Sequence, residues 1–322
     1  MKVLVCGAGG FIGGHLAKFL YKKGLYVIAV DIKWDGFIPE PFCHEKITGD
    51  LREFEVCDAL TKGVDWVFQL AADMGGIGYI TQVGADIMKN NALININMLE
   101  ASTRNGVKRF FFSSSACVYP EYKQLDPNVT ALKEEDAIPA QPDQFYGWEK
   151  LFTEKLCEAY KRDKGLDVRV ARFHNIYGPY GVYEGGREKA PAALCRKVAL
   201  ARDGDEIEIW GDGKQTRSFC YIDDCVEGIW RLMNSDYDQP LNIGSDELVT
   251  IEDLAKMIIE ISGKKLRLKY DLSKPQGVRG RNSDNTKIKQ VLGWAPSTPL
   301  KVGIERTYRW IEQHIRERLR ER

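Results

Sequence analysis

Residues 2–31, KVLVCGAGGFIGGHLAKFLYKKGLYVIAVD, are the stretch that decides the fold. The apolar runs at 2–6 and 26–31 predict two strands, and apolar residues at helical spacing over 11–23 predict an amphipathic helix between them. A glycine cluster precedes this helix, and Gly24 ends it. The stretch therefore predicts a β-α-β unit.

The same alternation of strands and helices continues as far as residue 173. It is typical of a parallel sheet whose right-handed crossovers place helices on both faces. We therefore expect an α/β fold, with a Rossmann-type doubly wound parallel sheet. Further strands are expected at 65–72, 108–115 and 166–173, and helices at 84–105 and 143–164.

Composition excludes several classes of partner. The 322 residues include 46 Lys and Arg and 46 Asp and Glu, so the net charge is zero and neither a nucleic acid nor an anionic membrane surface is expected as a partner. There is no apolar run of about 18 residues, so no membrane span is expected. The eight cysteines form no paired CxxC motif, so no metal site is predicted, and reduced thiols in the cytoplasm are expected.

The glycine cluster GAGGFIG at 7–13 has the spacing G-x-x-G-x-x-G and lies between an expected strand and an expected helix. Without side chains, the backbone can approach a pyrophosphate, and the helix N-terminus offers free N–H groups. The cluster therefore predicts a dinucleotide site, with a tight structural turn as the alternative. Its predicted cofactor-binding residues are Gly7, Gly10, Phe11, Ile12 and Gly13.

An acidic residue at the end of the second strand indicates which dinucleotide binds. The carboxylate of Asp31 can accept both ribose hydroxyls and would repel a 2′-phosphate, which favours NAD over NADP. A helix-capping or solvated aspartate is the alternative. Asp50 and Leu51 follow a third expected strand, and we expect them to lie near the adenine.

The domain organisation follows from a change of pattern after residue 174. Residues 175–189 are rich in glycine, aromatic and charged side chains and predict a loop, and GDG within 206–219 predicts the turn of a hairpin. We expect a smaller mixed α/β domain there for the substrate. The expected NAD-binding domain is 1–174 with returning segments near 221–234 and 240–245, and the expected substrate domain is 175–220 and 246–322.

Tyr146 and Lys150 form a Y-x-x-x-K pair on the helix expected at 143–164, where a spacing of four places them on one face. A free tyrosine has a pKa of about 10, and a nearby ammonium and a nicotinamide cation would both favour its phenolate. Tyr146 is therefore a candidate catalytic base, and Lys150 is a candidate ligand of the nicotinamide ribose. The hydroxyls at the end of the 108–115 strand, Ser115 among them, could meet the same substrate oxygen.

Taken together, GAGGFIG, Asp31, SSSACVYP (113–120) and YGWEK (146–150) resemble the extended short-chain dehydrogenase/reductase superfamily, whose members modify nucleotide sugars. Further segments bring the resemblance to its NAD-dependent nucleotide-sugar epimerases over nearly the whole chain. These segments are MGGIGYI (74–80), FHNIYGPYG (173–181), GGREKAPAALCRK (185–197), WGDGKQTRSF (210–219), NIGSDE (242–247) and GVRGRNSDN (277–285).

The resemblance implies that a GDP-sugar is inverted at carbons 5 and 3 after transient oxidation of carbon 4. A ketone at carbon 4 makes the hydrogens on both neighbouring carbons removable, and returning a proton to the opposite face inverts each centre. This chemistry needs an acid/base group on each face of the ring. The resemblance assigns these roles to Cys117 and Lys189, alongside Tyr146, Lys150 and Ser115.

Position 117 and its neighbour distinguish relatives within the superfamily. Dehydratases carry Asp-Glu where this chain has Ala116 and Cys117, and carbon-4 epimerases usually carry threonine at the second position. The nearest alternative is an enzyme like GDP-fucose synthase, which pairs a cysteine with a histidine in place of Lys189 and uses NADPH. A dehydrogenase that releases NADH and a non-catalytic NAD-sensing protein are further alternatives.

The resemblance also implies a binding surface for the substrate and a homodimer formed through the helices at 84–105 and 143–164. Basic side chains suit the diphosphate, polar side chains line the sugar and nucleotide pocket, and glycines let the backbone approach the hexose. The implied substrate-binding residues are Gly75, Gly76, Gly78, Ser115, Ala116, Cys117, Asn175, Glu188, Lys189, Lys197, Gln215, Arg217 and Arg281.

Overall fold

The structure is a computed structural model that describes residues 1–320. Its centre is a seven-stranded sheet in the order β11-β6-β5-β4-β1-β2-β3, and every neighbouring pair is parallel. This arrangement confirms the predicted doubly wound α/β sheet. The strands are β1 (Lys2–Cys6), β2 (Tyr26–Asp31), β3 (Glu45–Thr48), β4 (Trp66–Gln69), β5 (Arg109–Ser115), β6 (Val168–Phe173) and β11 (Leu241–Ile243).

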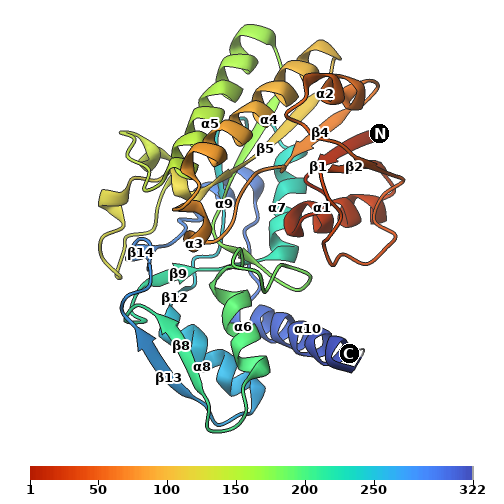
Figure 1. Cartoon of the computed structure of the whole chain (residues 1–322). Helices are drawn as coiled ribbons and strands as arrows, with labels where there is room; N and C mark the ends of the chain where they lie inside the picture. Colours follow the sequence, from red (N-terminus) through yellow and green to blue (C-terminus); the bar gives the residue numbers. More distant parts are fainter. Residues whose placement is uncertain (321–322) are drawn as a thin grey trace.

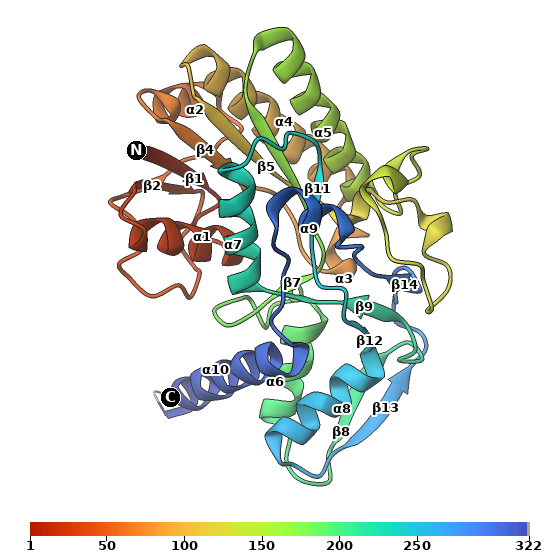
Figure 2. The same cartoon turned by 180° about the vertical axis from the view of Figure 1, so that it is seen from behind.

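Helices cover both faces of this sheet (Figures 1 and 2). Alternate residues of β1 enter different cores: Val3 packs with Leu16 of α1, whereas Leu4 packs with Met98 of α4. Burial on both faces explains why the strands are almost continuously apolar. The covering helices are α1 (Phe11–Lys22) and α7 (Ile222–Met233) on one face, and α2 (Phe54–Thr61), α4 (Gly84–Arg104) and α5 (Phe145–Lys164) on the other.

The remaining elements form three small sheets with their own helices. The strands are β7 (Ile176–Tyr177) with β10 (Cys220–Tyr221), β8 (Glu206–Trp210) with β13 (Arg267–Asp271), and β9 (Thr216–Ser218) between β12 (Leu248–Thr250) and β14 (Gly280–Arg281). The helices are α3 (Ile77–Ile80), α6 (Ala190–Leu200), α8 (Ile251–Ser262), α9 (Thr286–Leu292) and α10 (Leu300–Arg320), and 3-10 turns occur at Ala116–Val118, Glu121–Lys123 and Glu134–Ala137. The division into two domains stays a prediction.

The prediction of a hairpin at 206–219 is wrong. The GDG turn exists, with Gly211 and Gly213 at positive φ, but β8 and β9 on either side of it belong to different sheets. Strand β8 pairs in parallel with β13, and β9 pairs antiparallel with β12. Partners from later in the chain therefore replace the local pairing that the turn suggested.

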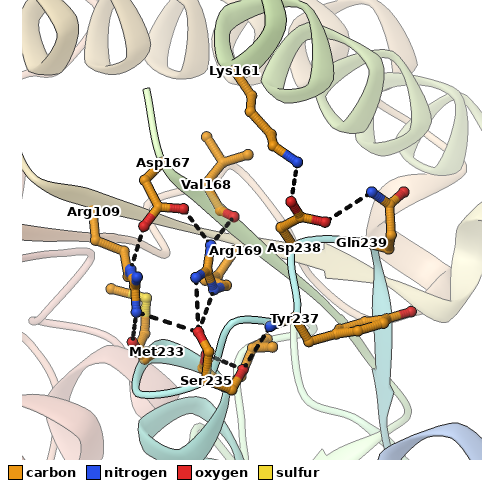
Figure 3. A network of polar contacts seen from close by, with 11 residues as sticks. Arg109, Lys161, Asp167, Val168, Arg169, Met233, Ser235, Tyr237, Asp238 and Gln239 are labelled. Atoms are coloured by element: carbon orange, nitrogen blue, oxygen red, sulfur yellow. Dashed lines mark hydrogen bonds and ion pairs between the residues drawn. The ribbon is translucent and has the colours of Figure 1, made fainter. Parts of the chain in front are cut away.

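A polar network fixes the segment between α7 and β11 to the amino ends of β5 and β6 (Figure 3). Arg109, at the start of β5, donates to the carbonyl of Met233 over 2.6 Å, and Arg169 of β6 donates to that of Ser235 over 2.7 Å. Asp167 pairs with both guanidinium groups. The chain after α7 is thus held at the amino ends of β5 and β6, which places β11 in register beside β6.

Residues 1–320 contain neither a membrane-spanning helix nor a cluster of metal-ligating side chains. In this range, no helix is both long and apolar enough to cross a membrane. The same residues contain no group of three His, Cys, Asp or Glu side chains placed to hold a metal ion.

Candidate active site

The glycine loop connects β1 to α1 at the carboxyl edge of the sheet, which is where ligands of open α/β sheets bind. Gly7 has φ 79°, and a β-carbon added to Gly13 would lie 2.1 Å from the Gly7 carbonyl oxygen. Helix α1 can therefore begin directly against the strand end. Its N-cap residue, Gly10, makes no side-chain cap, so the first N–H groups stay free for an anion. The loop, with Phe11 and Ile12 in the first turn, fits a dinucleotide pyrophosphate.

Asp31 connects the end of β2 to the glycine loop. Its Oδ2 accepts the Gly9 N–H over 2.9 Å, and its Oδ1 accepts the Ile32 N–H over 2.7 Å. Burial raises the pKa of Asp31, and these N–H donors partly oppose the shift. Each carboxylate oxygen has lone pairs beyond these bonds, so the carboxylate fits the ribose hydroxyls of NAD.

Asp50 and Leu51 follow β3, as expected. The guanidinium of Arg52 donates to the Asp50 carboxylate over 2.6 Å, and this contact lowers the pKa of Asp50. Leu51 is buried in the core beneath α4. Contact of either residue with the adenine stays a prediction.

Tyr146 and Lys150 share one face of α5, as their spacing predicted. Lys150 Nζ donates to the Ser113 carbonyl over 2.8 Å and lies 5.5 Å from the centre of the Tyr146 ring. Burial lowers the pKa of Lys150 and raises the pKa of Tyr146, and negative charge on nearby Cys117 or Glu149 raises the Tyr146 pKa further. The protein alone therefore holds Tyr146 as a phenol, and an added cation such as nicotinamide would favour the phenolate.

Gly147 brings α5 onto the segment that carries Cys117. A β-carbon at Gly147 would lie only 2.1 Å from the Cys117 carbonyl oxygen, so glycine is required for this contact. Gly147 was not among the predicted site residues, although it lies within the YGWEK motif at 146–150. A small residue next to the Tyr of a Y-x-x-x-K pair is the signal that could have identified it.

Cys117 lies in the 3-10 turn that follows β5, next to Ser115 and Ala116. Its N–H donates to Ser115 Oγ over 3.1 Å, and Arg281 Nη1 donates to its sulfur over 3.4 Å. The structure therefore adds Arg281, which is 7% exposed, to the environment of this thiol.

Lys189 is the N-cap residue of α6. Burial lowers its pKa, while nearby Cys117 raises it and Arg281 lowers it further. The structure thus brings Lys189 and Cys117, which are distant in sequence, into the same electrostatic environment. Asp143, which the sequence analysis missed, pairs with Arg281 over 3.2 Å.

Arg217 and Arg281 form a cationic region in the second part of the chain, where Arg281 is buried and Arg217 is partly buried. Burial lowers the pKa of Arg217 to about 9, and the neighbouring Arg281 adds to the shift. The Arg217 guanidinium donates only to backbone carbonyls, those of Thr216 and Gln276, and no ion pair forms with it in the described part of the chain. A partly buried cation that forms no ion pair among residues 1–320 is suited to an anionic ligand such as a diphosphate.

The other implied substrate residues have varied surroundings. Asn175 has φ 46° and donates from Nδ2 to the Ser218 carbonyl over 3.0 Å. Oε1 of Gln215 is buried without a hydrogen-bond partner among residues 1–320, and its contact with the substrate stays a prediction. Glu188 accepts the Gly186 N–H over 2.7 Å.

Lys197 is separated from the other two basic residues. Its ammonium donates to the Glu208 carbonyl over 2.9 Å and lies 3.6 Å from the Glu208 carboxylate, which holds it against β8. No hydrogen bond or ion pair within residues 1–320 connects it to Arg217 or Arg281. Contact between Lys197 and the substrate stays a prediction.

The three glycines at 75–78 contact other parts of the protein. An added β-carbon at Gly75 would meet the Tyr79 ring at 2.9 Å, one at Gly76 would meet the Glu188 carbonyl at 2.7 Å, and one at Gly78 would lie 3.7 Å from Trp210. These glycines therefore pack the segment around α3 against the loop before α6 and against β8.

A glycine loop after β1, an aspartate ending β2 and a Tyr-Lys pair on α5 beside the serines of β5 define a dinucleotide-dependent enzyme of the short-chain dehydrogenase/reductase type. Comparison with known proteins agrees. The model of the NAD dependent epimerase/dehydratase family matches residues 3–244, and the chain belongs to this family. This finding confirms the predicted superfamily and the NAD cofactor.

Individual relatives give a closer comparison. GDP-mannose 3,5-epimerase 1 of Oryza sativa subsp. japonica is 54% identical over 316 residues, which cover 98% of this chain and 82% of the rice protein. UDP-glucose 4-epimerase of Thermotoga maritima, solved with UDP-glucose, is similar with a TM-score of 0.89 at 28% identity, covering 98% of this chain and 100% of that chain. UDP-glucuronic acid 4-epimerase of Bacillus cereus, solved with UDP-glucuronic acid and NAD, has a TM-score of 0.84 at 27% identity and the same coverage.

Proposed function

We propose that this protein converts GDP-D-mannose into GDP-L-galactose, with some GDP-L-gulose, by inverting carbons 5 and 3 of the sugar. One observation carries the proposal: Gly147 packs the helix of Tyr146 and Lys150 against the turn of Cys117, and Lys189 lies near enough to Cys117 for their charges to interact. A carbon-4 oxidation alone has no need of two further acid/base groups. The similarity to the rice GDP-mannose 3,5-epimerase supports the same substrate.

The residues around β5 and α5 would serve the oxidation step. Bound NAD supplies a reversible hydride acceptor for carbon 4. Tyr146 takes the proton of the carbon-4 hydroxyl and later returns it, while Ser115 orients the same oxygen. Lys150, fixed by the Ser113 carbonyl, holds its positive charge next to the Tyr146 ring. The hydride that leaves carbon 4 and the proton that leaves its hydroxyl both return in the same cycle, so no net redox change occurs.

Cys117 and Lys189 would carry out the inversion. Once carbon 4 is a ketone, a hydrogen on carbon 5 or 3 leaves as a proton, and the C–H electron pair becomes part of an enolate. One of the two side chains accepts this proton, and the other donates a proton to the opposite face. Burial lowers the pKa of Lys189, which increases the fraction of neutral amine available as a base.

Several alternatives are less well supported by the residues. A dehydratase needs a carboxylic pair where this chain has Ala116 and Cys117. The carboxylate of Asp31 would repel the 2′-phosphate that an NADPH-dependent reductase must bind. Lys189 stands where a GDP-fucose synthase has histidine. A dehydrogenase that releases NADH, or a non-catalytic NAD sensor, would leave Cys117 and Lys189 without a role.

One nuclear magnetic resonance experiment tests the function. The purified protein is incubated with GDP-D-mannose in D₂O, and we expect deuterium at carbons 3 and 5 of the recovered sugars and signals of GDP-L-galactose. Tyr146→Phe should abolish conversion, and Cys117→Ala should stop deuterium uptake while carbon-4 oxidation survives. Cys43→Ala, which changes a cysteine outside the site, is the control. Deuterium uptake by Cys117→Ala equal to that of the unaltered protein would remove Cys117 from the mechanism.

We also propose that the protein is a homodimer formed through α4 and α5. These helices pack side by side (Figure 1), and both expose large apolar side chains. On α5, Phe145, Trp148 and Phe152 follow one stripe and are 60%, 43% and 49% exposed. Leu93 and Ile96 of α4 are also exposed. An apolar area of this kind is typical of a protein–protein interface.

A reducing compartment such as the cytoplasm is the proposed location. All eight cysteines are free thiols, and six of them are buried. Free thiols persist where glutathione and thioredoxin keep them reduced. Immunofluorescence of the tagged protein tests this proposal.

A further inference from the structure

Three side chains connect the segment around α3 to the loop that carries Lys189. The hydroxyl of Tyr79 donates to Asp73 over 2.8 Å and accepts from the Arg187 guanidinium over 2.7 Å. The guanidinium lies over the Tyr79 ring, 4.0 Å from its centre, and 3.7 Å from the Asp73 carboxylate. Asp73, Tyr79 and Arg187 are called the latch below.

The latch is anchored at one end to the rigid part of the fold. Asn91 of α4 accepts the Asp73 N–H over 2.6 Å and donates to its carbonyl over 3.0 Å. Asn90 donates to the Asp73 carboxylate over 3.2 Å. The position of Asp73 is therefore determined by α4, which packs directly against α5, the helix of Tyr146.

At its other end, the latch holds the 184–189 loop, which is also held by the Glu184–Arg318 ion pair and by the bond from the Gly186 N–H to Glu188. Gly185 and Gly186 precede Arg187, both at positive φ and both with open space where a β-carbon would be. Lys189 follows Arg187 by two residues. The backbone contributes one further contact, in which the Gly76 N–H donates to the Arg187 carbonyl over 3.1 Å. Fixing Arg187 thus restricts where the Lys189 side chain can lie.

The latch is poorly suited to a role in global stability. Arg187 is 48% exposed, and exposed ion pairs contribute little to the free energy of unfolding. Yet its three groups form a stacked and hydrogen-bonded arrangement next to a proposed acid/base residue. This combination indicates a local role, in which geometry matters more than stability.

We propose that Asp73, Tyr79 and Arg187 are positioning residues that close the 73–80 segment onto the 184–189 loop and hold Lys189 in place for proton exchange with the sugar. This inference rests on the proposed function. The proposal predicts different effects on the oxidation step and on proton exchange. The latch supports Lys189, whereas Tyr146 and Lys150 are fixed by α5 and β5.

Kinetics on the holoenzyme test the role of the latch. In Arg187→Ala and Tyr79→Phe, we expect single-turnover oxidation of carbon 4, followed by nicotinamide absorbance, to change less than about twofold. Deuterium exchange into the sugar and kcat should both fall about tenfold or more, because a small displacement of a reacting group is costly. Arg187→Lys keeps the positive charge but lacks the planar guanidinium, so it should restore only part of the lost deuterium exchange and kcat. Arg162→Ala, at an exposed ion pair on α5, is the matched control.

Two further measurements make the outcome decisive. Amide hydrogen exchange of residues 184–189, measured without substrate, should increase in both latch variants and stay unchanged in Arg162→Ala. The double variant Tyr79→Phe/Arg187→Ala should be no slower than Arg187→Ala, since both changes disrupt one unit. Unchanged amide exchange, additive losses, or equal losses in oxidation and proton exchange would each overturn the latch. Absence of deuterium uptake by the unaltered protein would instead overturn the proposed function, and amide exchange would still decide whether the latch holds the loop.

Discussion

Gly147 lies directly against the backbone of Cys117, at a distance that excludes any side chain. A β-carbon at Gly147 would be 2.1 Å from the Cys117 carbonyl oxygen, where an ordinary contact is more than an ångström longer. This contact brings the helix of Tyr146 onto the turn of Cys117. Tyr146, the proposed base of the oxidation step, and Cys117, a proposed acid/base group of the inversion step, are thereby held in a fixed relation.

Gly147→Ala should therefore separate these two groups. We expect kcat to fall about a hundredfold, because a displacement of about 1 Å has this effect on well-positioned catalytic groups. The cost in stability should be about 1–3 kcal/mol, as for other overpacked sites. Gly228→Ala on α7 is the control, since its nearest neighbours are side-chain atoms at 3.1 Å or more, which can move. If Gly147→Ala retains full activity, the contact has no catalytic importance.

His174 gives the fold a defined sensitivity to acid. It is fully buried, its Nε2 lies 3.0 Å from Asn242 Oδ1, and its Nδ1 has no partner within residues 1–320. Burial lowers the pKa of His174 to about 3, and nearby Arg281 and Arg172 lower it too. In the unfolded chain, an ordinary histidine has a pKa of about 6.5. Below that pH the unfolded state binds a proton that the native state does not, so stability falls as the pH falls from 6.5 towards 3.

The expected size of this effect can be measured by urea unfolding. Between pH 7 and pH 5, His174 should account for about 2 kcal/mol of lost stability. From pH 7 to pH 5, the free energy of unfolding of His174→Gln should therefore fall by about 2 kcal/mol less than that of the unaltered protein. The variant is nevertheless less stable at pH 7, because its packing is altered. An identical pH dependence in the variant and the unaltered protein would contradict the assignment.

The sequence predicted those parts of the site that depend on local spacing. Gly7 to Gly13 and the Tyr146-Lys150 pair are each defined within one turn or one helix, so their geometry follows from the pattern of residues. The pairing of β8 with β13 and the contact of Arg281 with Cys117 join positions far apart in the chain, and no local pattern encodes them. Family resemblance named Cys117 and Lys189, but the latch residue Arg187 became recognisable only when the structure placed Tyr79 beneath it.

The proposed dimer predicts a clear effect of one surface substitution. Trp148→Glu places a charge in the exposed apolar stripe of α5, and burying that charge in an interface would be costly. We expect sedimentation velocity to show a dimer for the unaltered protein and a monomer for the variant. Leu272→Glu is the control, because Leu272 is 72% exposed and lies next to β13, away from α4 and α5. A monomeric unaltered protein would refute the proposal.

Arg217 should show opposite effects on stability and on ligand binding. Its partly buried guanidinium forms no ion pair within residues 1–320, and burial lowers its pKa to about 9, so the free protein holds a charge in an unfavourable environment. Arg217→Gln removes that charge, and we expect the Tm of the free protein to rise by about 2–4 °C. Calorimetry with GDP should show affinity reduced about tenfold or more, because a buried charge-assisted hydrogen bond to the diphosphate is lost.

A neighbouring arginine separates this effect from a general loss of positive charge. Arg279 already pairs with Asp212 over 3.0 Å and is 31% exposed, so Arg279→Gln should lower the Tm slightly and leave GDP affinity within about twofold. A site built for a diphosphate requires the two variants to differ in both measurements. If Arg217→Gln binds GDP as tightly as the unaltered protein, the anion must lie elsewhere, and Arg281 with Lys197 would become the next residues to test. If its Tm falls instead of rising, the guanidinium is stabilised by its bonds to the Thr216 and Gln276 carbonyls and is not an uncompensated charge.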